Sequence, residues 1–206
     1  VLDRMILNSL FPDTTYANES GGDPDVIPEL TYEEYLNFHR TYYHPSNSYI
    51  YLYGNMDMEE KLAFLDEHYL SHFDYLDVDS VIQEQKAFGA CRDVTLEYPV
   101  AENEGEEDNT YLSYNMVVGN AADSQMAMAF EVLDYALLSA PGAPLKQALL
   151  DVKAGKDVYG SYDDGILQPY FTVIAKGSNP DRKEEFVSVI RQVLGNIVKN
   201  GIDKKA

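Results

Sequence analysis

Residues 16–47 are the most informative stretch of the chain and read YANESGGDPDVIPELTYEEYLNFHRTYYHPSN. The glycines and prolines between residues 20 and 28 predict a loop, because glycine permits positive φ and proline keeps its neighbour extended. Thr31 and Glu34 match the capping box that begins many helices. Pro45 disfavours helix at the residue before it. The stretch therefore predicts a loop, a helix that begins after Thr31, and a stop before Pro45.

The residues on either side of this stretch predict further regular structure. Apolar residues recur at helical spacing over residues 1–10. Residues 48–54 alternate aromatic and aliphatic side chains, which is typical of a strand. Asp57 is expected to cap a helix that follows. From residue 73 to residue 92 the periodic pattern gives way to a polar connector, which indicates a domain boundary.

The second half of the chain predicts both strands and helices. Strands are expected at residues 93–98 and 110–118, as an antiparallel pair, and at residues 159–162 and 170–175. Helices are expected to begin at Asp123, at Pro144, and at Asn179 or Asp181.

The order of these elements predicts an α+β fold. After the connector the order is β-β-α-α-β-β-α, and before it the order α-α-β-α matches the tail of a similar unit. We expect two related units with antiparallel sheets and helices packed on one face, the first unit being incomplete. The expected domains are residues 1–73 and 93–206, joined by a connector at residues 74–92.

The composition is that of an acidic globular protein. The chain has 206 residues, of which 45% are hydrophobic, and 35 acidic against 15 basic side chains give a net charge of −20. Such a charge repels nucleic acid and anionic membranes, so neither is an expected partner. It would favour basic peptides or small cations, but plain solubility is the preferred explanation.

Cysteine usage and hydropathy bear on the compartment. Cys91 is the only cysteine, so no disulfide forms within the chain. No run of about 18 apolar residues predicts a membrane span, and no signal-peptide pattern opens the chain. We expect a cytoplasmic protein. Both ends read as cuts within a longer polypeptide, the second just after a helix stop at Gly201.

The histidines are the first candidates for a metal site. His68 and His72 lie four residues apart on an expected helix, so they would share one face, with Glu67 adjacent. A zinc site needs three or four ligands, and no third ligand follows from the spacing. Ordinary histidines near a helix C-terminus are therefore the favoured interpretation. His39 and His44 are spaced wrongly for one helical face, and His44 is expected to cap carbonyls at a helix end.

The remaining polar motifs favour structural roles. The turn at residues 20–23 resembles an anion nest but lacks the lysine and the strand of a phosphate loop. Asp163-Asp164-Gly165 lacks the ligand spacing of a calcium loop and predicts a hairpin turn. The acidic run from Glu102 to Asp108 is interpreted as a solvated loop, with a metal or basic-peptide contact as the alternative. We therefore assign no catalytic and no metal-binding residue, and substrate-binding residues stay unknown.

Nine short segments stand out together: Leu10–Tyr16, Ser20–Pro24, Ile27–Thr31, Phe38-His39, Tyr43–Asn47, Tyr53–Asn55, Gly142–Leu149, Tyr170-Phe171 and Asn200-Gly201. They resemble segments of one enzyme family, the pitrilysin/insulinase-type zinc metallopeptidases (inverzincins), in their presequence-protease branch. The first five are specific, and the later ones agree mainly by their order along the chain.

The resemblance implies a mitochondrial-processing-peptidase-like fold and a place within a longer chain. Residues 1–73 would be the C-terminal part of the catalytic-type domain, and residues 93–206 a second, non-catalytic domain. In the family, a His-x-x-Glu-His helix and a later Glu hold zinc in the first domain. That motif is absent here, and the later Glu would lie before Val1, so no zinc ligand is carried over to this chain.

Three hypotheses follow from these observations. The favoured one is an internal, chamber-forming segment of a zinc-dependent oligopeptidase that degrades unstructured peptides, inactive by itself and in contact with the remaining domains of its parent. The second is a non-catalytic structural or peptide-binding homologue of the family. The third is a local metal-binding module that uses His68 and His72.

Overall fold

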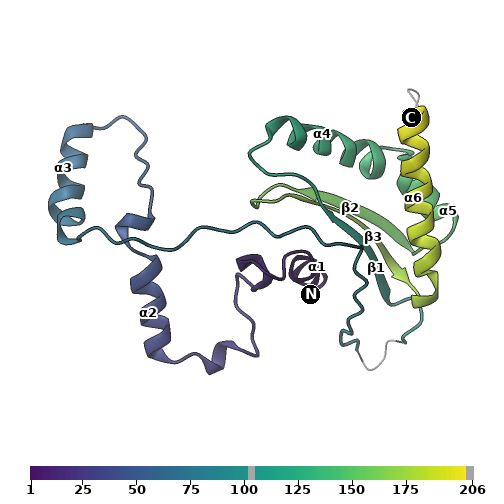
Figure 1. Cartoon of the computed structure of the whole chain (residues 1–206), viewed down its shortest axis with the longest axis horizontal. Coiled ribbons are helices and arrows are strands. Elements are labelled where there is room, and N and C mark those ends of the chain that lie inside the picture. The colour runs from purple at the N-terminus through teal and green to yellow at the C-terminus, as the bar shows by residue number, and fades with distance from the viewer. Residues whose placement is uncertain (102–104, 203–206) are drawn as a thin grey trace. The chain divides into compact units, whose positions relative to one another are not determined.

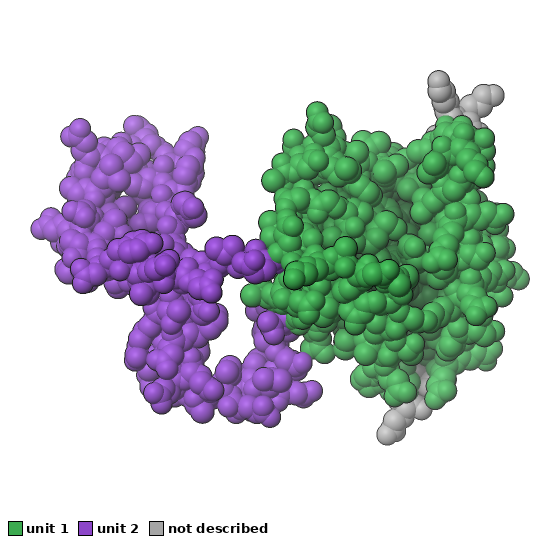
Figure 2. Space-filling model, viewed as in Figure 1, with its two compact units in different colours: residues 1–17, 84–206 green, residues 18–83 purple. Residues whose placement is uncertain are grey.

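The structure is a computed structural model that describes residues 1–101 and 105–202 (Figure 1). The chain divides into two compact units (Figure 2). We name them the sheet unit, Val1–Ala17 with Glu84–Ala206, and the helical unit, Asn18–Gln83. These units differ from the expected family domains at residues 1–73 and 93–206 with their connector at residues 74–92, and that division stays a prediction.

The sheet unit contains one antiparallel sheet and the helices that cover it. Its elements in chain order are α1 (Leu2–Leu10), η1 (Thr15–Ala17), β1 (Thr110–Val117), α4 (Ser124–Asp134), the π-helical turn η5 (Tyr135–Ser139), α5 (Pro144–Asp151), β2 (Asp157–Asp163), β3 (Tyr170–Ser178), η6 (Pro180–Arg182) and α6 (Lys183–Asn200). The strand order is β1-β3-β2, and both neighbouring pairs are antiparallel. The α+β class, with an antiparallel sheet and helices packed against it, is thus confirmed.

The central strand β3 organises the core because it is apolar on both faces. Residues 170–175 are all buried. Phe171 and Val173 pack with α4, α5 and α6 in the larger cluster, whereas Tyr170 and Ile174 pack with α1 in the smaller one. This division follows the two-residue period of a strand. Figure 1 shows the same arrangement, with α1 on the side of the sheet opposite to α4 and α6.

The N-terminal helix α1 therefore completes the core of the sheet unit. Ile6 and Leu10 are buried, and Phe11 is fully buried, with its ring edge-on to Tyr170 at 6.2 Å. Burying a side chain of this size contributes about 1.5–3 kcal/mol. Gln85 fastens the same region, since its side-chain amide bonds Asp13 and its backbone N–H donates to Gln168.

The helical unit contains two helices and several short turns joined by extended segments. Its elements are η2 (Ile27–Glu29), α2 (Tyr32–Tyr42), η3 (Pro45–Asn47), α3 (Met58–His68) and η4 (Leu70–His72). The predicted capping box is confirmed, because Thr31 and Glu34 bond each other's backbone N–H groups. Asp57 caps α3, as expected. None of residues 18–83 is buried.

Two predicted strands are wrong. Residues 48–53 and 93–98, all of them described, have no ladder of backbone hydrogen bonds and are coil. A strand is stable only when a neighbour pairs with its N–H and C=O groups, and alternation in sequence does not supply that neighbour. Side chains hold the second segment instead, through an ion pair of Asp93 with Lys183 and a hydrogen bond from Tyr98 to the carbonyl of Asn109.

Candidate functional site

The predicted pair of histidines does not share a helical face. The helix α3 ends at His68, because Tyr69 leaves the helical region at φ −141° and ψ −66°. His72 belongs to the separate turn η4. Both side chains are exposed, and His68 contacts Phe64 at 4.5 Å between ring centres. The four-residue spacing therefore does not place these two imidazoles on one helix.

His39 and His44 have partners of their own. His39 stacks on Tyr43, with ring centres 4.8 Å apart. The Nδ1 atom of His44 accepts a hydrogen bond from the backbone N–H of Ser46 at 3.2 Å. The prediction that His44 caps carbonyls is wrong, since Pro45 redirects the chain into η3 and leaves an N–H within reach of the ring. Among the described residues, no three His, Cys, Asp or Glu side chains are grouped so that they could hold a metal ion.

In the two glycine-containing turns, aspartate side chains accept hydrogen bonds from nearby backbone N–H groups. Gly22 adopts φ +83°, and the Asp23 carboxylate accepts a hydrogen bond from the N–H of Asp25 at 3.0 Å. The Asp163 carboxylate accepts from the Gly165 N–H at 3.1 Å and from the Tyr170 hydroxyl at 3.0 Å. Burial, followed by the neighbouring Asp163 carboxylate, raises the pKa of Tyr170. The second turn joins β2 to β3 as the predicted hairpin.

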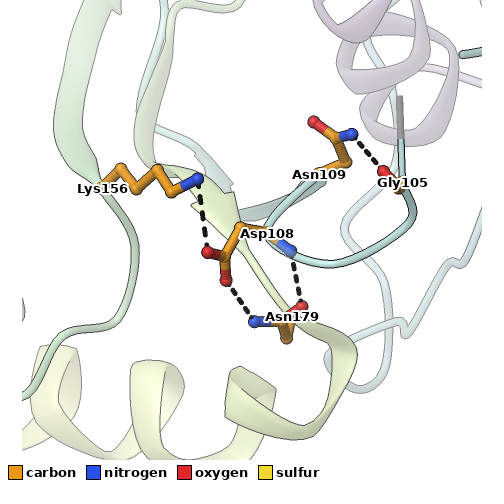
Figure 3. A network of polar contacts seen from close by, with 5 residues as sticks. All are labelled: Gly105, Asp108, Asn109, Lys156 and Asn179. Carbon is orange, nitrogen blue, oxygen red and sulfur yellow. Dashed lines mark hydrogen bonds and ion pairs between the residues drawn. The ribbon is translucent and has the colours of Figure 1, made fainter. Parts of the chain in front are cut away.

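The most developed polar constellation is the Asp108 cluster, which consists of Asp108, Lys156 and Asn179 (Figure 3). The Asn179 side chain donates to the Asp108 carboxylate at 2.7 Å and accepts from the Asp108 backbone N–H at 2.9 Å. The Lys156 ammonium lies 3.3 Å from the other carboxylate oxygen. These bonds join the loop before β1 to the start of β2 and the end of β3.

The cluster favours the ionised form of Asp108. The hydrogen bond from Asn179, and next the Lys156 ammonium, hold the pKa of the Asp108 carboxyl below its ordinary value. The backbone at Asp108 lies in the left-handed region at φ +57°, a conformation that Asp and Asn tolerate better than most residues. Because the carboxylate is already bonded to an amide and an ammonium, the cluster is suited to fastening a loop.

A hollow of about 320 Å³ lies beside this cluster. Its lining includes Asp108, Tyr111, Lys156, Asp157 and Lys176. The two ammonium groups and the two carboxylates leave the hollow without a dominant sign of charge. It therefore offers no charge selection for an ionic ligand.

Reasoning from the sequence missed the Asp108 cluster. The run from Glu102 to Asp108 was interpreted as a solvated loop, and its residues 102–104 lie outside the described part of the chain. The sequence predicts only that Asn179 or Asp181 begins a helix. Asn179 does precede η6, but its side chain makes no capping bond there and bonds Asp108 instead. Since these two residues are 71 positions apart, no local pattern signals the contact.

Comparison with known proteins assigns the family. Residues 29–206 match the model of the peptidase M16 inactive domain. The chain is 47% identical over 205 residues to "Protein HypA" of Clostridium perfringens, covering 100% of this chain and 21% of that protein. It is 33% identical to presequence protease 1 of Arabidopsis thaliana, covering 100% of this chain and 19% of that protein. The mitochondrial presequence protease of Xenopus laevis is 30% identical over 98% of this chain and 20% of its own length.

The chain spans about a fifth of the length of the curated relatives it matches. In the described part of the chain, no helix has the length and apolarity needed to cross a membrane. With the inactive-domain model covering residues 29–206, the chain belongs to the M16 (pitrilysin/insulinase) peptidase family, in its presequence-protease branch.

Proposed function

We propose that this chain is a non-catalytic, chamber-forming segment of a zinc peptidase that degrades unstructured peptides. The match of residues 29–206 to the M16 inactive domain is the observation that carries the proposal. The relatives named presequence proteases, which align with nearly the whole chain, support the peptide substrate class. The acidic surface, with a net charge of −20, favours basic peptides.

The zinc of such a peptidase would be held outside this chain. The sequence contains no His-x-x-Glu-His run. His68 and His72 lie on separate elements, and no third ligand accompanies them among the described residues. These residues do not fit a catalytic zinc site, which takes three protein ligands. The contribution of this chain is therefore structural: it braces neighbouring domains and forms part of the wall around the substrate. We also propose a cytoplasmic location for the parent protein.

Cleavage assays test the proposal with the chain and its full-length parent side by side. We expect the parent to cleave an unstructured basic peptide and to lose that activity with a zinc chelator. The isolated chain is expected to show no cleavage, with or without added zinc. Chelator-sensitive cleavage by the isolated chain would contradict the non-catalytic assignment.

Two further measurements separate the alternatives. A parent that binds the peptide without cutting it, and whose sequence lacks a His-x-x-Glu-His run, would support the non-catalytic homologue instead. Elemental analysis of the isolated chain addresses the local metal module. Stoichiometric zinc that disappears in His72→Ala, but persists in the exposed control His39→Ala, would establish a site at His68 and His72.

A further inference from the structure

The hollow of about 320 Å³ at the end of the sheet is built around a bulge in the central strand β3. Thr110 of β1 lies opposite Ser178 of β3. The next residue of β1, Tyr111, lies opposite Lys176. Gly177 is therefore an extra residue on β3, and its backbone lies in the left-handed region at φ +68°. Bulges redirect side chains and are frequent next to functional sites.

Three side chains stand in a row across the sheet at this bulge. Lys176 on the central strand lies opposite Tyr111 of β1 on one side and opposite Asp157 of β2 on the other. Residues directly opposite each other on neighbouring strands share one face of the sheet. All three residues line the hollow. An ammonium, a phenol ring and a carboxylate thus border it from one face of the sheet.

The two charges in this row do not pair with each other. Among the described residues, the Lys176 ammonium makes no hydrogen bond or ion pair, and it lies 6.0 Å from the centre of the Tyr111 ring. The Oδ1 atom of Asp157 accepts from the Val158 N–H at 2.8 Å and lies 3.6 Å from the Lys146 ammonium. Its Oδ2 atom has no partner within the described part of the chain. Since opposite charges at facing strand positions ordinarily attract, both groups are available to a ligand.

The other charged side chains of the hollow are already bonded. The Asp108 carboxylate accepts from the Asn179 amide at 2.7 Å and lies 3.3 Å from the Lys156 ammonium (Figure 3). Gly177 leaves room for this lysine, because a Cβ atom at residue 177 would lie 3.0 Å from its side-chain carbons. These residues form a wall of the hollow, and Lys176 and Asp157 are left to bind.

The charges of these two groups select the class of ligand. A simple anion would be attracted by Lys176 and repelled by Asp157, and a simple cation would meet the reverse. A molecule with both a carboxylate and an ammonium satisfies the two groups through charge-assisted hydrogen bonds. The volume of about 320 Å³ is at the lower end of the range for ligand pockets, about 300–1,000 Å³, so the ligand is small.

We propose that this hollow binds a small zwitterion, with the ligand carboxylate at the Lys176 ammonium and the ligand ammonium at the Asp157 carboxylate. Free amino acids and short peptides share this chemistry. Binding at the hollow requires no cleavage and no zinc, so the inference goes beyond the proposed function and does not depend on it.

A titration followed by amide chemical shifts in NMR tests the site in the whole chain of 206 residues. The probes are L-alanine and the dipeptide Ala-Ala. We expect saturable binding with a Kd on the order of 1 mM, and shift changes at residues 108–111, 156–158 and 176–177. Tighter binding of Ala-Ala assigns the site to short peptides, and tighter binding of L-alanine assigns it to free amino acids. If neither probe binds at about 10 mM, the inference is overturned.

Blocked dipeptides test the two charges of the ligand. N-acetyl-Ala-Ala lacks the ammonium, and Ala-Ala-amide lacks the carboxylate. Each is expected to bind at least about fivefold more weakly than the stronger of the two unblocked probes, because one charge-assisted contact is lost. Undiminished binding of either blocked dipeptide would show that the hollow does not recognise a zwitterion.

Variants test the two charges of the protein. Lys176→Gln and Asp157→Asn are each expected to weaken binding at least about fivefold. Asn at residue 157 keeps an oxygen for the Val158 N–H, so β2 is preserved. The controls Lys199→Gln and Asp66→Asn remove the same charges from exposed helical positions and should leave binding unchanged.

Equal affinity in the wild-type chain and in both site variants would overturn the inference. If a site variant does not fold, the other variant and the blocked dipeptides still decide.

Discussion

Gly160 in β2 shows how a single residue can set the spacing of the sheet unit. A Cβ atom at this position would lie 2.1 Å from the carbonyl oxygen of Thr172 and 2.5 Å from Leu138. Backbone on the paired strand cannot move aside without breaking the ladder between β2 and β3. The absence of a side chain at residue 160 therefore permits η5 to pack closely on the sheet.

Substitution of this glycine is expected to destabilise the protein. We expect Gly160→Ala to lower the free energy of unfolding by at least about 2 kcal/mol, because the added methyl group overpacks the site. The matched control is Gly195→Ala in α6, where nothing lies within 4 Å of the added Cβ. Gly195→Ala should stabilise α6 by about 0.5–1 kcal/mol, because alanine favours the helical conformation more than glycine does. Urea unfolding followed by circular dichroism measures both, and equal effects of the two substitutions would refute the argument.

Asp108 gives the sheet unit a pH dependence of stability. Its pKa is lower in the folded chain than the ordinary value of 3.8. The folded state therefore binds fewer protons at this group than the unfolded state does. Its stabilising contribution is complete above about pH 4 and is lost as the pH falls through the lowered pKa.

Asp108→Asn tests this dependence because Asn tolerates the same backbone conformation. The wild-type chain should unfold at higher urea concentration than Asp108→Asn at pH 7, and the difference should shrink as the pH is lowered below about 4. Lys156→Gln, which keeps the hydrogen bond from Asn179, should reproduce part of the effect. If the difference in unfolding urea concentration between the two proteins stays constant between pH 7 and pH 3, the Asp108 carboxylate is not the cause of the pH dependence.

At the scale of elements, a side-chain cap accounts for where α2 begins. Thr31 Oγ1 accepts from the Glu34 N–H at 3.2 Å, and the Glu34 carboxylate accepts from the Thr31 N–H at 2.9 Å. The bond from the Thr31 backbone N–H, and next a hydrogen bond from the Thr31 hydroxyl to the same carboxylate, lower the pKa of Glu34. Because α2 buries no residue, its cap contributes a large share of its stability.

Removal of the Thr31 hydroxyl is expected to fray the start of α2. Thr31→Ala should cost the helix about 1 kcal/mol, so the amides of its first turn should exchange about fivefold faster. Thr41→Ala, near the other end of the same helix, serves as the control and should leave those amides unchanged. Amide exchange measured by NMR distinguishes the two variants, and an unchanged first turn in Thr31→Ala would argue against the cap.

The helix α1 illustrates an element whose place depends on a distant strand. Its apolar spacing predicted a helix over residues 1–10, and α1 is confirmed at Leu2–Leu10. The same spacing does not identify the surface that it covers. That surface is the second apolar face of β3, since Tyr170 and Ile174 pack with Ile6, Leu10 and Phe11.

Loss of the Phe11 side chain is therefore expected to detach α1 from the sheet. Phe11 is 0% exposed, so Phe11→Ala should cost about 3–5 kcal/mol. Phe64→Ala is the matched control, because Phe64 in the helical unit is 58% exposed and should cost little. Thermal unfolding compares the stability of the two variants directly. Similar losses of stability in both variants would contradict the assignment of α1 to the core.

At the scale of the whole molecule, the two units differ in how much surface they bury. All of the buried hydrophobic side chains identified in the described residues belong to the sheet unit. The helical unit combines nine of the 17 tyrosines with a net charge of −12, and it buries none of them. The two units should therefore open with very different free energies.

Limited proteolysis is expected to reveal this difference. The first cleavages should fall within residues 18–83 and the exposed coil at 86–101, while residues 110–200 persist as one fragment. Phe186→Ala, which empties a fully buried position of the core, should make that fragment susceptible as well. Mass spectrometry of the products locates the cuts. Early cleavage within residues 110–200 of the wild-type chain would refute the expected order.

Residues close together in the chain were enough to predict the α+β class, the capping box at Thr31 and Glu34, the cap at Asp57 and the hairpin at Asp163. Each of these depends on hydrogen bonds or periodicity within a few positions, which the order of residues specifies directly. The family resemblance was likewise present in short local motifs. Contacts between distant residues decided the rest. The pairing of Asp108 with Asn179, the cover of β3 by α1, and the lack of a ladder at residues 48–53 and 93–98 all depend on which segments meet. A strand or a charged cluster needs a partner, and only the folded chain brings that partner within bonding distance.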